Sequence, residues 1–333
     1  MGSTEKTPVQ SGNTEDIILP DLPVIDSHIH LWRRNGTDYL AADFLNDAAS
    51  GHNVGASIYV ECDMSFNEAE REDLRPVGET QHVLRQVEQA RGGPHRLAAG
   101  IMGFAELMLG DNVRDVLDAH IEAGNGRFKG IRSRVSWDAD PAVGYNEHPY
   151  YPHGDAMNDP AYVRAAGCLS DLGLVLELWA LHPQLDDVCT FAKKVPDLPV
   201  VINHLGGPIG IGSYAAHRAE VFQRWSVSMK ALAELPNVSV KVGGLGIGRM
   251  GFRFPGGKAA TSDQLVAAWK PYVETAVDVF GTKRSMFGSN FPVDRAAASY
   301  PVLLNAYKKM LLGLNDGEIA SVFSGTAKEL YKL

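Results

Sequence analysis

Short apolar runs alternate with longer segments of helical periodicity along most of the chain. The apolar runs cover residues 24–31, 56–62, 97–104, 128–135, 174–180, 200–205, 238–243 and 285–290. Most of them are continuously apolar rather than alternating, which is the pattern of strands that are covered on both faces. We therefore predict a buried β-strand for each run.

Between these runs, apolar residues recur with the period of an amphipathic helix. The helical segments cover residues 78–91, 113–123, 161–172, 185–194, 215–235, 263–280 and 300–312, and a final helix is expected at 316–331. Eight strands with helices between them predict the α/β class and a (β/α)8 TIM barrel. A doubly wound open sheet is the alternative, because the two folds share this local pattern.

The remaining segments set the domain organisation. Residues 1–20 are rich in Ser, Thr, Glu and Asn, which predicts a flexible N-terminal tail. No shift in composition divides the rest of the chain. We therefore expect residues 21–333 to form a single barrel domain, a common size for this fold.

Composition narrows the class of protein and of partner. The chain is 45% hydrophobic and 21% charged, as in soluble globular proteins, and its net charge of -9 argues against binding to nucleic acid or anionic membranes. No apolar run is long enough for a membrane span, and the first residues lack the apolar core of a signal peptide. Three widely spaced cysteines, Cys62, Cys168 and Cys189, indicate reduced thiols in a cytoplasmic protein. A small-molecule substrate is the expected partner, and a homodimer is the expected assembly.

Polar residues gather where the predicted strands end, which is where barrels of this kind place their catalytic groups. His28 and His30 are two residues apart on one strand, so their side chains point the same way. Two adjacent buried imidazoles are costly unless a metal or an anionic substrate uses them. The other strand-end residues are Glu61, Arg132, Glu177, His182, Asn203, His204, Lys241, Asn290 and Asp294, with Lys129 and Arg134 as the least informative members. Such a set predicts an active site.

Four segments resemble the amidohydrolase superfamily, and its amidohydrolase 2 branch in particular. They are residues 26–30 (DSHIH), 181–183 (LHP), 203–208 (NHLGGP) and 286–294 (MFGSNFPVD). That branch includes lactonases of sugar acids and of aromatic breakdown products, as well as decarboxylases of the aminocarboxymuconate-semialdehyde type. The resemblance implies a TIM barrel whose divalent metal, expected to be Zn, would be bound by His28, His30, His182 and His204.

One position departs from the family pattern. Much of the superfamily has an Asp at the end of the eighth strand, as metal ligand and general base, whereas this chain has Asn290. An amide is a poor ligand and cannot take a proton from water near neutral pH, so Asp294 or Glu61 becomes the expected base. The predicted catalytic residues are thus His28, His30, His204, Asp294 and Glu61. The predicted substrate-binding residues are Arg132, His182, Lys241, Asn290 and Glu177.

The resemblance and these residues together predict a hydrolase for a small carbonyl substrate. A lactone or ester with a carboxylate or phenolic group is expected, attacked by an activated water while a His cluster or a metal polarises the carbonyl. A non-oxidative decarboxylase is one alternative, although it would require a firmly held metal and an eighth-strand Asp. A non-catalytic binding barrel is the other.

Two further segments invite different interpretations. Residues 246–251 (GIGRMG) match the G-x-G-x-x-G pattern, but the following FRFPGG cannot open the helix that dinucleotide binding needs. We expect a lid or a substrate wall there instead. Residues 145–153 (YNEHPYYPH) predict a loop over the site, in which His148 or His153 would contact substrate.

Overall fold

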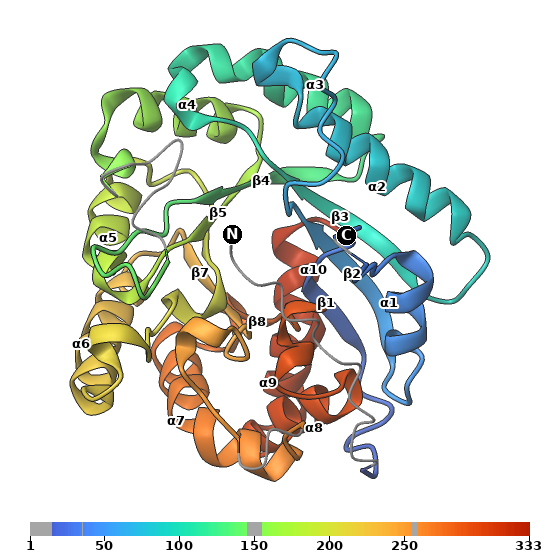
Figure 1. Ribbon diagram of the computed structural model, residues 1–333, viewed down its shortest axis with the longest axis vertical. Coiled ribbons are helices and arrows are strands. Elements are labelled where there is room, and N and C mark those ends of the chain that lie inside the picture. The colour runs from blue at the N-terminus through green and yellow to red at the C-terminus, as the bar shows by residue number, and fades with distance from the viewer. Residues whose placement is uncertain (1–14, 35, 145–154, 255–258) are drawn as a thin grey trace.

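A computed structural model describes residues 15–34, 36–144, 155–254 and 259–333. Its eight parallel strands follow one another around a barrel in chain order, each hydrogen-bonded to the next, with helices outside them (Figure 1). The strands are β1 (Val24–Ile29), β2 (Val54–Val60), β3 (Arg96–Gly103), β4 (Phe128–Arg134), β5 (Val175–Trp179), β6 (Val200–Ile202), β7 (Val238–Val242) and β8 (Ser285–Phe287). This sequential order confirms the (β/α)8 barrel and excludes a doubly wound sheet, in which the strand order reverses.

The helices lie close to their predicted ranges. They are α1 (Ala41–Ala48), α2 (Val77–Gln89), α3 (Val113–Gly124), α4 (Pro160–Asp171), α5 (Leu185–Lys194), α6 (Arg218–Ala233), α7 (Ser262–Phe280), α8 (Tyr300–Met310), α9 (Asp316–Ala320) and α10 (Thr326–Leu330). Caps explain several of the starts: the Asp159 side chain accepts from the Ala161 amide before α4, and Thr261 accepts from Gln264 before α7. The short α1 was not predicted, and a π-helical turn at Ser321–Gly325 interrupts the expected final helix.

Two strands, β6 and β8, end three residues before their apolar runs do, more than any other strand. β6 stops at Ile202 and β8 at Phe287, shortly before residues with a left-handed backbone. His204, Leu205 and Asn290 have φ values of 51°, 53° and 57°, in the left-handed region that non-glycine residues rarely adopt. Such strained positions gather at functional sites, and here they lie at the strand ends that carry candidate catalytic residues.

The barrel closes between β1 and the segment after β8. The amide of His30 donates to the carbonyl of Phe291 at 2.8 Å, and the amide of Asn290 donates to the carbonyl of His28 at 2.9 Å. The closure therefore binds the strand of the two histidines directly to the loop that carries Asn290.

The C-terminal segment fills the other end of the barrel. Tyr331 and Ala327 pack against interior side chains from β2, β3, β5, β6 and β8, namely Ile58, Val60, Met102, Val175, Val201 and Met286. Tyr331 is buried, although it lies two residues from the end of the chain. Ala327 and Tyr331 thus form part of the barrel core.

Part of the predicted N-terminal tail is docked. Lys308 Nζ on α8 donates to the carbonyls of Ile18 and Leu19 at 3.0 and 2.7 Å, and Glu15 accepts from the amide of Ser262 at 2.8 Å. The docked structure therefore begins before residue 21. Among the described residues, no helix is both long and apolar enough to cross a membrane.

Candidate active site

Three of the four predicted histidine ligands gather at the ends of β1 and β6. The ring centroids of His28 and His30 are 4.9 Å apart, and those of His28 and His204 are 4.4 Å apart. All three residues are buried. A Cβ at Gly244 would lie 2.1 Å from His204 Nδ1, and Gly244 has a φ of 77°. This position therefore requires glycine to make room for the imidazole.

Burial keeps these imidazoles neutral. Burial, and secondarily the charge of Arg132, lowers the pKa of His30 to about 3. The pKa values of His28 and His204 also lie well below the usual value, mainly through burial and secondarily through Lys241 and Arg132 respectively. Near neutral pH each ring therefore offers one N–H donor and one lone pair rather than a positive charge.

A cavity of about 280 Å³ opens on this cluster. We call it the strand-end cavity, and it is lined by His30, Trp32, Arg34, Cys62, Asp63, Arg132, Arg134, Trp179, His204, Ile247, Arg249, Asn290 and Val293. Four of these residues are arginines and one is an aspartate. The cavity is therefore suited to an anionic molecule, because guanidinium groups match carboxylates in geometry and charge.

Several lining residues were not predicted from the sequence. Three of them lie in loops a few residues after a strand end, namely Trp32 and Arg34 after β1 and Asp63 after β2. The prediction covered mainly residues at the strand ends themselves. Arg134 was ranked among the least informative members, yet it stands two residues from Arg132 on β4 and so points the same way. The two-residue spacing in the sequence therefore predicts that the side chains of Arg132 and Arg134 lie on the same face of β4.

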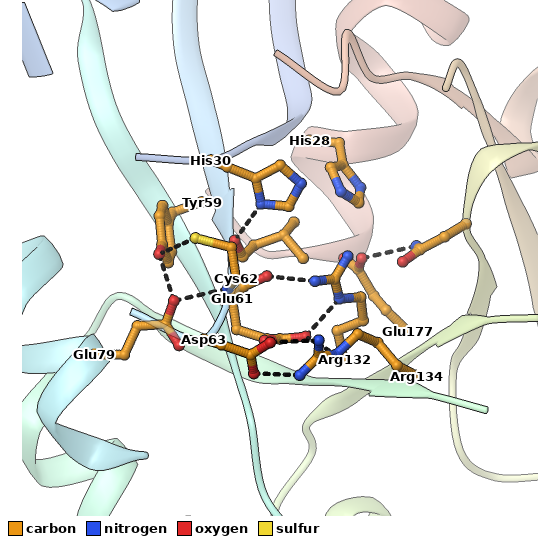
Figure 2. Close-up of polar contacts among 12 residues, drawn as sticks. His28, His30, Tyr59, Glu61, Cys62, Asp63, Glu79, Arg132, Arg134 and Glu177 are labelled. Atoms are coloured by element: carbon orange, nitrogen blue, oxygen red, sulfur yellow. Dashed lines mark hydrogen bonds and ion pairs between the residues drawn. The ribbon is translucent and has the colours of Figure 1, made fainter. Parts of the chain in front are cut away.

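Glu61 is held by arginines rather than free to act on a substrate (Figure 2). Its Oε1 atom accepts from Arg132 Nε at 2.7 Å and lies 3.2 Å from Arg134 Nε. Arg134 Nη1 also donates to Asp63 at 2.6 Å. Carboxylates thereby hold two of the four guanidiniums that line the cavity, those of Arg132 and Arg134.

A second buried carboxylate fixes the loop after β2. Glu79 on α2 accepts from the backbone amide of Cys62 at 2.7 Å and from Tyr59 Oη at 2.6 Å (Figure 2). Burial and the nearby charge of Glu61 raise the pKa of Glu79 to about 8. Sequence reasoning missed this residue because it lies within a helix.

Asn290 lies between His30 and Asp294. Its Oδ1 atom is 3.3 Å from His30 Nε2, and its Nδ2 atom donates to Asp294 Oδ1 at 2.7 Å. The other carboxylate oxygen of Asp294 accepts from the amide of Gly246 at 2.9 Å. Burial raises the pKa of Asp294 to about 7. The carboxylate thus folds back towards the strand end, behind Asn290.

Glu177 and Lys241 bind each other instead of lining the cavity. Lys241 Nζ is 2.7 Å from both carboxylate oxygens of Glu177, and both side chains are buried. Asn203 also donates to Glu177, at 2.9 Å. Lys129, at the start of β4, lies close enough to Lys332 for their charges to interact, at the opposite end of the barrel.

His182 stands apart from the other histidines. Its ring packs against Tyr214 with centroids 5.1 Å apart, and its Nδ1 atom accepts from the amide of Ile209 at 3.3 Å. It lines a separate cavity with Ser213, His217, Glu220, Val221 and Arg224. The structure therefore does not bring the predicted four-histidine set together.

A zinc ion does not fit the side chains as predicted. Within residues 15–34, 36–144, 155–254 and 259–333, no group of three or more His, Cys, Asp and Glu side chains is arranged to hold a metal ion. Structural and catalytic zinc sites have at least three such ligands. The donor set at the end of β1 and β6 lacks a carboxylate because Asn290 stands where the family pattern has Asp.

Of the two remaining segments, residues 246–251 and 145–153, the structure describes only the first. After β7 the chain forms a short 3₁₀ turn, Gly248–Met250, and no α-helix begins before Ser262 in the described residues. Ile247 and Arg249 of this loop line the strand-end cavity, and a role as a lid or substrate wall stays a prediction. The predicted loop 145–153, with His148 and His153, lies outside the described residues.

Known proteins resemble the chain over nearly its full length. Protein y4mH of Sinorhizobium fredii is 31% identical, with 95% of this chain and 100% of that protein covered. The L-fucono-1,5-lactonase of Burkholderia multivorans is 26% identical, with coverage of 93% and 96%. A crystal structure of a Burkholderia multivorans amidohydrolase with bound Zn has a TM-score of 0.70 at 24% identity, covering 93% of this chain and 99% of that one.

A family model covers the barrel from within β1 onwards. The model described as Amidohydrolase, Amidohydro_2, matches residues 25–333. The chain therefore belongs to the amidohydrolase family.

Proposed function

We propose that the protein hydrolyses a small lactone or ester that carries a carboxylate or phenolic group. The observation that carries this proposal is the strand-end cavity, in which four arginines surround neutral histidines. An anionic group of the substrate would bind the guanidiniums and place the carbonyl against the histidines. The name of the Burkholderia multivorans relative, L-fucono-1,5-lactonase, supports a lactone as the reacting group.

His204 is the proposed carbonyl-polarising residue, because it lines the cavity and is neutral. His30 also lines the cavity, but its Nδ1 atom donates to the carbonyl of Val60 at 2.8 Å, so its Nε2 atom offers a lone pair rather than a proton. A tetrahedral oxyanion is stabilised by fixed donors in a site shielded from water. Arg132, which is buried and held by Glu61, adds a positive charge that need not move during the reaction. This arrangement favours the transition state over the neutral ground state.

Asp294 is the proposed general base. A base works best when its pKa is near the working pH, and burial raises the pKa of Asp294 to about 7. Glu61 fits this role less well, because its Oε1 atom is shared by two guanidiniums. Since Asn290 separates Asp294 from the cavity, the proton would pass through one bridging water that Asn290 helps to orient.

A matched substrate panel tests the proposal. Sugar-acid 1,5-lactones, aromatic lactones and simple esters would be assayed in pairs with and without a carboxylate, on the wild type and on His204→Ala. We expect turnover of lactones, a lower KM for the carboxylated member of each pair, and loss of turnover in His204→Ala by a factor of about 10² or more. No turnover of any lactone, or turnover unaffected in His204→Ala, would refute the proposal.

A further inference from the structure

A continuous line of buried side chains joins the end of the chain to the first histidine of β1. Tyr331 Oη donates to Glu177 Oε1 at 2.6 Å, and Glu177 accepts from Lys241 Nζ at 2.7 Å. Lys241 Nζ lies 3.4 Å from His28 Nδ1. All four residues are at most 1% exposed, so water does not compete for these contacts. The line runs through the barrel interior, from the C-terminal segment to the active site.

Lys241 can only donate along this line. An ammonium group has three donors and no acceptor. Lys241 Nζ also contacts the carbonyl oxygen of Ser27 at 2.6 Å, so its partners are that carbonyl, the Glu177 carboxylate and His28 Nδ1. His28 Nδ1 must therefore be the acceptor. In a neutral imidazole the proton then resides on Nε2, because the hydrogen bond at one ring nitrogen decides the state of the other.

We infer that Tyr331 and Glu177 are positioning residues, which hold Lys241 so that it fixes His28 as the tautomer with its proton on Nε2. His28 Nε2 is buried and has no hydrogen-bond partner among the described residues. Buried polar atoms are normally paired, so this N–H is a donor reserved for a group that enters with the substrate. The inference rests on the proposed function in assigning that group to the oxyanion or the attacking water.

Lys241, Glu177 and Tyr331 thereby have roles that differ from those expected from the sequence. Lys241 and Glu177, expected to bind substrate, instead set the proton of a histidine beneath the cavity. A protonated Nε2 has no lone pair to give to a metal, which agrees with the missing ligand set around His28. Tyr331 gains a role at the active site although it lies two residues from the chain end.

The mildest variant is Tyr331→Phe. It removes one hydroxyl and keeps the ring in the barrel core, and Glu177 retains its bonds to Lys241 and Asn203. A stronger variant is the double change Lys241→Met with Glu177→Gln, which removes the buried charge pair without leaving either charge alone. Tyr162→Phe is the matched control, because Tyr162 is a buried tyrosine on the outer helix α4 that packs against Phe191.

The tautomer can be read without any substrate. In protein labelled with ¹⁵N-histidine, long-range ¹⁵N–¹H correlations distinguish a protonated ring nitrogen from an unprotonated one, and a His28→Gln sample identifies the His28 signals. We expect His28 to carry its proton on Nε2 in the wild type and in Tyr162→Phe, and to lose this preference in the double variant. A His28 proton on Nδ1, or an Nε2 proton that persists in the double variant, would overturn the inference even if lactone hydrolysis is confirmed.

Kinetics then tests the link to Tyr331. We expect Tyr331→Phe to lower kcat about tenfold with little change in KM, as loss of an orienting partner does, while Tyr162→Phe stays at the wild-type rate. An unchanged kcat in Tyr331→Phe, with the protein folded, would overturn the role of Tyr331. If no lactone is hydrolysed at all, the proposed function fails while the NMR experiment still decides the tautomer.

Discussion

Asn290 and Asp294 are joined side chain to side chain, with Asn290 Nδ2 donating to Asp294 Oδ1 at 2.7 Å. The amide occupies the strand end where the family pattern has a carboxylate, and the carboxylate lies one layer behind it. This pairing gives the site a buried acid whose pKa is about 7, without placing a negative charge beside His30.

The first prediction concerns the pH dependence of catalysis. A base must be deprotonated to act, so kcat/KM should rise with pH through the Asp294 pKa of about 7 and level off above it. Asp294→Asn should lower kcat by about 10²–10⁴ and abolish this rise. A pH–rate profile measured with the best lactone checks it. An Asp294→Asn variant with the wild-type profile would show that Asp294 is not the base.

The second prediction concerns stability and uses the same group. Burial raises the pKa of Asp294 from 3.8 to about 7, so over that interval the folded protein holds a proton that the unfolded chain has released. The contribution of Asp294 to stability is therefore present below pH 4 and is lost as pH rises to about 7.

Urea unfolding at several pH values checks this sign. The free energy of unfolding of the wild type should fall relative to Asp294→Asn between pH 4 and pH 7, by about 4 kcal/mol at most. The other titrating groups contribute equally to the free energy of unfolding of both proteins, so their effect cancels in this difference. A wild type that gains stability relative to the variant over this range would contradict the raised pKa.

The third prediction concerns the arginines of the strand-end cavity. Arg249→Gln should raise KM for carboxylated lactones by about fivefold and leave neutral lactones nearly unaffected, because a partly exposed ion pair contributes about 1 kcal/mol. The same preference should weaken with added salt. Steady-state kinetics on the paired substrates measures both effects, and equal losses for charged and neutral lactones would exclude anion binding by Arg249.

The fourth prediction concerns metal removal. The described side chains do not provide three His, Cys, Asp or Glu ligands, so chelation followed by gel filtration should leave kcat/KM unchanged. Elemental analysis of the same sample must show that the metal has been removed. Activity that disappears on chelation and returns with added Zn²⁺ would contradict the donor geometry described above.

The fold was predictable because its signal is repeated. Eight continuous apolar runs separated by helical periodicity fit the barrel, and errors at single boundaries did not alter the count. The boundaries failed where tertiary structure overrides local pattern. The apolar run after Val200 continues beyond the strand, but β6 ends at Ile202, shortly before the left-handed backbone at His204 and Leu205.

The site was predictable only in part. His28, His30 and His204 were brought together because strand ends converge on one face of a barrel, a property of the fold. The partners of Lys241 and Glu177 were not predictable, because both lie at strand positions that face the interior and only the third dimension pairs them. The separation of His182 from the cluster depends on a loop conformation that periodicity does not encode.

The most direct test of the central claim is the rate of hydrolysis of a carboxylated lactone by the chelated wild type and by its His204→Ala variant. The geometry predicts turnover by the metal-free wild type and a loss of about 10² or more in the variant, with circular dichroism unchanged. Absence of lactone turnover in the wild type, or equal turnover in both proteins, would contradict it.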